Sequence, residues 1–76
     1  MEFYTIFYDY LDKRGHRRTK KLICCGSDRL KEKCQGIMNL KDHKPVSKPL
    51  IYITKGVDEY IDTVDFDNII KGGKLN

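Results

Sequence analysis

Hydrophobic and β-branched positions form two runs near the start of the chain. Residues 2–10 are rich in aromatic and β-branched side chains, and residues 17–25 begin polar and end in Leu-Ile-Cys-Cys. Such runs are typical of strands. Between them, Asp12-Lys13-Arg14-Gly15 suits a type I turn in which the glycine takes a left-handed conformation. The pattern therefore predicts a β-hairpin.

The turn also predicts the pairing of the two strands. Side chains alternate between the faces of a strand, so each face of the hairpin collects every second residue. One face is expected to pair Tyr10 with Arg18, Tyr8 with Lys20, Ile6 with Leu22 and Tyr4 with Cys24. The other carries Phe3, Thr5, Phe7 and Asp9 beside Cys25, Ile23, Lys21 and Thr19. Both faces are cationic near the bend, so we expect the basic end to project beyond the core.

Residues 27–40 have the spacing of an amphipathic helix. Ser27 is the expected N-cap, and Asp28 places negative charge in the first turn. An apolar stripe recurs at i, i+4, i+7 and i+8, and it consists of Leu30, Cys34, Ile37 and Met38. We expect this stripe to face the sheet.

The rest of the chain predicts a loop and further strands. Residues 41–49 hold two prolines and predict a loop, and residues 50–54 predict a short strand. Residues 57–67 fit either a helix or a fourth strand, and we favour the strand because Thr63, Val64 and Phe66 prefer it. Residues 71–76 are expected to be a frayed tail.

The order of these elements defines the fold class. It predicts one α+β domain over residues 1–76, of the form ββαβ(β), with one helix on one face of a small antiparallel sheet. The other face would be uncovered, and we expect tyrosines and the stems of basic side chains to form it.

Charge is the strongest functional signal. Residues 13–21 hold six fixed positive charges in nine positions, at the predicted bend. Like charges this close together repel unless salt or an anionic partner screens them. Phosphates attract cations and unpaired bases stack on rings, so the pattern indicates nucleic-acid binding. The candidate residues are Tyr8, Tyr10, Lys13, Arg14, Arg17, Arg18, Lys20 and Lys21.

Negative charge gathers near the other end. Residues 1–57 carry a net charge of +7 and residues 58–76 carry −3. One interpretation is that the acidic segment packs near the basic bend and neutralises part of it. Another is that a row of carboxylates imitates phosphates and occupies a basic groove of a nucleic-acid enzyme. That alternative surface consists of Asp58, Glu59, Asp62, Asp65 and Asp67.

Catalytic and metal chemistry have little support in the sequence. The three cysteines, Cys24, Cys25 and Cys34, lack the paired spacing of zinc ligands, and a small buried thiol is the simpler interpretation. Neither His16 nor His43 has a neighbour that resembles a nucleophile motif. We therefore expect a non-enzymatic protein with no cofactor and no metal.

The chain is similar in style to the small accessory proteins of phages and mobile elements. The resemblance rests on a short, basic chain built from Phe3–Tyr10, Arg17–Cys25 and Asp28–Met38. Among such proteins, anti-CRISPR proteins are often compact and non-enzymatic. The hairpin from Tyr8 to Lys21 followed by a helix also resembles the arm-type DNA-binding domain of phage integrases, although that family has three strands before its helix.

These observations favour a binding protein that acts on nucleic acid, or on a complex that handles nucleic acid, through a basic hairpin. The alternative is an inhibitor of a host defence nuclease that resembles anti-CRISPR proteins and uses segment 58–67 as a nucleic-acid mimic. We expect a cytoplasmic protein without a membrane partner. Its mixed strand edges are compatible with a homodimer.

Overall fold

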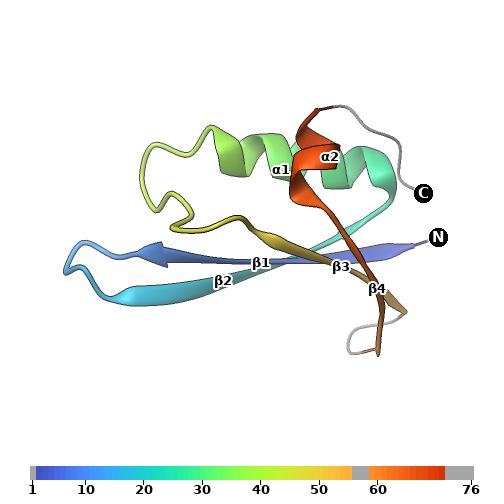
Figure 1. The fold of residues 1–76 in the computed structure, drawn as a ribbon, viewed down its shortest axis with the longest axis horizontal. Helices are drawn as coiled ribbons and strands as arrows, with labels where there is room; N and C mark the ends of the chain where they lie inside the picture. The colour runs from blue at the N-terminus through green and yellow to red at the C-terminus, as the bar shows by residue number, and fades with distance from the viewer. Residues whose placement is uncertain (1, 56–58, 72–76) are drawn as a thin grey trace.

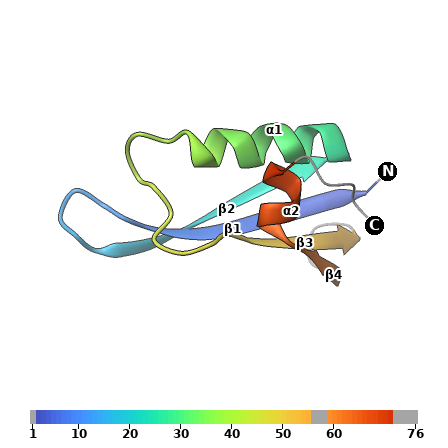
Figure 2. The same cartoon turned by 45° about the horizontal axis from the view of Figure 1, so that its top comes forward.

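The computed structural model describes residues 2–55 and 59–71. The elements follow the order β1 (Phe3–Leu11), β2 (Arg17–Cys25), α1 (Ser27–Met38), β3 (Leu50–Lys55), β4 (Glu59–Val64) and α2 (Phe66–Ile70). The strands form one antiparallel sheet in the order β2-β1-β3-β4. Both helices lie on the same side of this sheet, as Figures 1 and 2 show. The α+β prediction is confirmed, with a short second helix added.

The β1–β2 hairpin has the predicted register. Tyr10 lies opposite Arg18 and Tyr4 opposite Cys24. The connecting turn is closed by the Gly15 N–H, which donates to the Asp12 carbonyl at 2.9 Å, and Gly15 has a φ of 81°. A positive φ of this size is easy only for glycine, so the sequence of the turn decides how the strands pair.

The core fills the space between the sheet and the helices. Every second residue of β1 from Tyr4 to Tyr8 belongs to the core. Helix α1 contributes Leu30, Cys34 and Ile37, and helix α2 contributes Phe66 and Ile69. The sheet side of the core consists of Tyr4, Ile6, Tyr8, Cys24 and Ile51. Burial of these apolar side chains is the main force that holds the helices on the sheet.

Helix α1 differs from its prediction at both ends. Ser27 is the first helical residue and does not cap the helix, because Gly26 with a φ of 89° occupies the N-cap position. At the other end the helix stops at Met38, whose side chain is 55% exposed. The apolar stripe therefore ends at Ile37, one residue earlier than predicted.

The ambiguous segment divides into a strand and a helix. Strand β4 runs from Glu59 to Val64 and pairs with β3, which confirms the preferred strand there. The strand does not extend to Phe66, because that residue begins α2 and is buried against α1. Burial of Phe66 and Ile69 outweighs local strand preference at this point. Of the predicted tail, Lys71 follows α2 in a turn, and 72–76 lie outside the described residues.

Among the described residues, the structure has no helix that is both long enough and apolar enough to span a membrane.

Two glycines give a matched test of the fold. Gly36 lies inside α1, where an added Cβ would meet nothing within 4 Å. Gly36→Ala should therefore raise the free energy of unfolding by about 0.5–1 kcal/mol. A Cβ added at Gly26 also meets open space, but the positive φ of this residue strains an alanine. Gly26→Ala should therefore lower the free energy of unfolding by about 1–3 kcal/mol. Urea denaturation followed by circular dichroism checks both values. Effects of the same sign would contradict this account of the α1 start.

Candidate nucleic-acid interface

The bend end of the hairpin extends past the four-stranded part of the sheet. Residues Phe3 to Phe7 of β1 pair with both neighbours, β2 and β3. From Tyr8 to Leu11, β1 pairs with β2 and has an isolated bridge from Tyr10 to Pro45. This two-stranded ribbon with its turn, residues 8–21, is called the basic hairpin below. It forms one end of the molecule in Figure 1, as predicted from the sequence.

The basic hairpin presents its positive charge to solvent. All six of its Lys and Arg side chains belong to exposed residues. The ribbon also holds Asp9 and Asp12, so its net charge is +4. The exposed cations are Lys13, Arg14, Arg17, Arg18, Lys20 and Lys21.

The two carboxylates of the ribbon hold two of the arginines. The Nε of Arg17 donates to Asp9 at 2.9 Å, and the Nε of Arg18 donates to Asp12 at 3.1 Å. These exposed pairs add little stability. Each bond uses one of the five N–H donors of a guanidinium, so the pairing orients the group and leaves it chemically suited to bind a phosphate.

Hydrogen bonds also lower the pKa of both carboxyl groups. The hydroxyl of Thr19 donates to Asp9 at 2.6 Å and, with Arg17, holds the pKa of Asp9 below its usual value. The backbone N–H of His16, at 2.8 Å, is the largest cause of the lowered pKa of Asp12. Both groups are therefore charged wherever the hairpin is intact at neutral pH.

The loop between α1 and β3 supports the base of the ribbon. Its Val46 N–H donates to the Asp9 carbonyl at 2.9 Å. The ring of His43 lies 4.5 Å from that of Tyr10, centroid to centroid, and His43 has a φ of 56°. A positive φ is uncommon outside glycine, so the contacts around His43 hold an unfavourable backbone conformation in place.

The candidate base-stacking residues Tyr8 and Tyr10 do not lie on the uncovered face, where we expected tyrosines. Tyr8 shares the side of β1 that packs under the helices and is only 8% exposed. Tyr10 packs at the rim of the same core against His43. Because alternation puts Tyr8 in one row with the buried Tyr4 and Ile6, its ring is not free to stack on a base. Arg18 and Lys20 share this face with the tyrosines but are exposed.

A different set of rings occupies the uncovered face, which we call the open face. The cluster consists of Phe7 of β1, Tyr52 of β3 and Tyr60 of β4. The ring centroids of Phe7 and Tyr52 are 5.8 Å apart, and those of Tyr52 and Tyr60 are 5.0 Å apart. The centroids of Phe7 and Tyr60 are 6.4 Å apart. These three residues are called the aromatic platform below. The Nζ of Lys21 lies 5.9 Å from the Phe7 centroid. Local patterns could not have found the platform, because only the strand order brings its members together.

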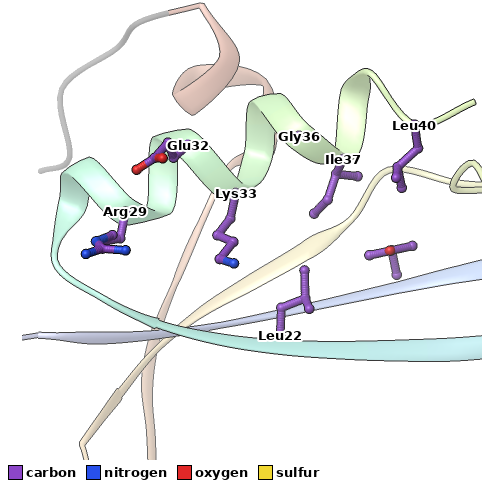
Figure 3. A pocket seen from close by; sticks show the side chains of 8 residues that line it. Leu22, Arg29, Glu32, Lys33, Gly36, Ile37 and Leu40 are labelled. Atoms are coloured by element: carbon purple, nitrogen blue, oxygen red, sulfur yellow. The ribbon is translucent and has the colours of Figure 1, made fainter.

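A groove of about 350 Å³ lies between α1 and β2. Figure 3 shows Lys33 pointing from the helix toward β2, and Leu22 pointing back from the strand. Arg29 and Tyr8 also line the groove. Arg29 and Lys33 thus place positive charge beside the β2 edge, and Glu32, which also lines the groove, offsets part of it.

The acidic segment lies at the opposite edge of the sheet. Because β4 and β2 are the two outer strands, the carboxylates of β4 are separated from the basic residues of β2 by β1 and β3. The interpretation that they neutralise it is therefore wrong. Asp65 and Asp67 instead contact Lys48, at 2.9 Å and 3.6 Å.

The acidic residues also do not form one row along a strand. Asp65 is the N-cap of α2 and Asp67 lies within that helix, whereas Glu59 and Asp62 belong to β4. Asp58 lies outside the described residues. The described carboxylates are thus divided between two elements.

The cysteines are three free thiols on adjoining elements, and Cys24 and Cys34 are buried. Among residues 2–55 and 59–71, no cluster of three or more His, Cys, Asp or Glu side chains has the arrangement of a metal site. Cys24 and Cys34 contribute to the core as small apolar groups.

Comparison with known proteins identifies no relative: no family model, curated protein or solved structure matches this chain. The two strands before α1 also differ from the three that the integrase arm domains have.

Acid should loosen the basic hairpin before it unfolds the core. The pKa values of Asp9 and Asp12 are lower in the folded protein than the ordinary carboxyl pKa of 3.8, so the two ionised carboxylates stabilise the hairpin. This stabilisation is complete above pH 3.8, and it is lost as the pH falls through the lower pKa values of the folded protein. Amide chemical shifts of Arg14 and His16, whose N–H groups donate to Asp12, should titrate in this range. Asp12→Asn should remove the transition. Shifts that stay constant down to pH ~2 would contradict the proposed role of these bonds.

The thiols should differ in reactivity. Burial raises the pKa of Cys34 to about 11 and also raises that of Cys24. The thiolate is the reactive species, so both should react slowly with iodoacetamide in the folded protein, and the partly exposed Cys25 should react first. Mass spectrometry with peptide mapping identifies the modified site, and Cys25→Ser is the control. Faster labelling of Cys34 would show that the core opens readily.

Proposed function

We propose that this protein is a non-catalytic nucleic-acid-binding protein whose basic hairpin contacts the phosphate backbone. The observation that carries the proposal is the exposure of six cations on a narrow two-stranded ribbon beyond the core. A ribbon of this kind is narrow enough for a major groove, and its cations suit a polyanion. The proposed mechanism is occlusion or positioning of the nucleic acid, with no bond broken.

Three features of the ribbon support contact with phosphates. Lys13 and Arg14 lie at the turn, where none of the described strands shields them. Arg17 and Arg18 are oriented by their carboxylate partners, which lowers the entropy cost of binding through their remaining N–H groups. The contacts from Val46 and His43 support the base of the ribbon.

The proposed biological setting is that of an accessory protein of a phage or mobile element. The small size, the basic composition and the single thin core support this setting by resemblance alone. In that setting the protein would act in the cytoplasm of the host cell.

A second candidate is an inhibitor that binds a nucleic-acid-handling protein, as anti-CRISPR proteins do. The observation that favours it is the separation of charge, with acidic residues on β4 and α2 and basic residues at the β2 edge. The contacts of Lys48 with Asp65 and Asp67 reduce the net charge of that region, which makes the described part of the acidic surface a weaker mimic.

Salt dependence separates direct binding from the alternative. Replacing Lys13, Arg14 and Lys20 with Gln removes three charges for which the structure records no carboxylate partner among the described residues. The slope of the logarithm of the binding constant against the logarithm of the salt concentration should become less steep. The change should be about 0.7–0.9 for each phosphate that the variant no longer neutralises. Fluorescence anisotropy with labelled DNA and RNA across a salt series measures the slope.

The control removes the same charge away from the hairpin, by replacing Lys31, Lys55 and Lys71 with Gln. It should leave the slope close to that of the parent protein. Equal reductions of the slope in both triple variants would mean that binding follows net charge alone.

Neutralising Asp58, Glu59, Asp62, Asp65 and Asp67 should tighten binding to nucleic acid, but it should weaken binding to a protein target if the inhibitor function is correct.

A further inference from the structure

The open face of the sheet is an unusual surface for so small a protein. Both helices pack on the opposite side, and no element among the described residues covers this one. The register places the exposed apolar side chains of Phe3, Ile23, Leu50 and Tyr60 on it. A contiguous apolar patch that a protein keeps in water is a common mark of a binding surface.

The centre of the open face is closed by large side chains. Thr5 lies there with an exposed fraction of 1%, and its hydroxyl has no hydrogen-bond partner among the described residues. Its neighbours along and across the strands are Phe3, Phe7, Ile23 and Tyr52. A threonine is buried on an uncovered face only when its neighbours lean over it. A ligand would therefore meet rings and aliphatic groups, not the backbone.

The aromatic platform follows adjacent strands from the centre of the sheet to its edge. Phe7 and Tyr52 are half-buried, whereas Tyr60 on the edge strand is 49% exposed. The planes of Phe7 and Tyr52 are 79° apart, and those of Tyr52 and Tyr60 are 54° apart. The rings are thus not stacked face to face, and Tyr60 is the most exposed ring of the three.

Positive charge joins the platform to the basic hairpin. Lys21 lies over Phe7, and Arg17 and Thr19 continue the same face of β2 toward the turn. Asp9 shares this face and is held by Arg17 and Thr19. Lys21 is therefore the cation on this face that lies next to the rings and has no carboxylate partner among the described residues. A second copy of the chain carries the same net charge of +4 and would be repelled, whereas a polyanion would be attracted.

We infer that the aromatic platform stacks unpaired bases, so that the protein binds single-stranded nucleic acid with its phosphates on the basic hairpin. This inference rests on the proposed nucleic-acid function and names the form of nucleic acid bound. Rings on an open sheet can stack only on bases whose faces are free, and those faces are occupied in a duplex. Every base has such a face, so no sequence preference follows.

The test compares three labelled probes at one low salt concentration. They are an oligothymidylate of about ten nucleotides, an abasic strand of equal length and a duplex of the same length. The abasic strand keeps the phosphates and lacks the bases. Stacking predicts that the parent protein binds the oligothymidylate tighter than the abasic strand by roughly 5- to 150-fold for each stacked base.

Variants of Tyr60 test whether the difference in affinity between the oligothymidylate and the abasic strand comes from the aromatic platform. Tyr60→Leu keeps an apolar side chain and removes the ring, and it should lower oligothymidylate affinity at least about fivefold with little effect on the abasic strand. Tyr60→Phe keeps the ring and should bind the oligothymidylate as the parent protein does. Met38→Ala changes an exposed apolar side chain on the helix side and serves as the control.

The outcomes distinguish failure of the stacking inference from failure of the hairpin proposal. Equal, salt-dependent affinity for the oligothymidylate and the abasic strand would overturn the stacking inference and leave the hairpin proposal standing. Failure to bind any probe would overturn the proposed function, and the inference with it. A dimer in sedimentation that Tyr60→Leu dissociates would also overturn the inference, because a second copy would then cover the open face.

Discussion

The alternation of side chains along β1 is the constraint on which the rest of the structure depends. The Asp12–Gly15 turn fixes the pairing with β2, so every second residue of both strands goes to the same face. One set of β1 residues, with Ile6 fully buried, packs beneath the helices. The other set, with Phe7, forms part of the open face. A shift of one residue would exchange the core and the proposed binding surface.

This constraint also explains how a thin domain can have two candidate contact surfaces. The helix layer uses one face of the sheet for stability, and no described element covers the other face. A chain of this size buries a smaller share of its surface than a large domain does, so it cannot cover both faces. The basic hairpin and the aromatic platform lie on what remains outside the core.

The sequence predicted well the features that depend on neighbouring residues. The turn, the strand pairing and the body of α1 follow from Gly15 and from the spacing of Leu30, Cys34 and Ile37. Features that depend on distant contacts were not predicted. Phe66 begins a helix because it packs against α1, and Tyr8 is buried because α1 covers its side of the hairpin. Neither partner can be identified from local periodicity.

The candidate site also has features that depend on neighbouring residues and features that depend on distant contacts. The sequence alone determined the cationic hairpin, because charge and turn residues lie within one short segment. Only the tertiary structure decided which aromatic residues share the open face, since Phe7, Tyr52 and Tyr60 meet through the strand order β1-β3-β4. It also decided that the acidic segment lies at the opposite edge from β2. Pairing between strands distant in the chain is chosen by burial of the whole sheet against the helices, and no local pattern records that choice.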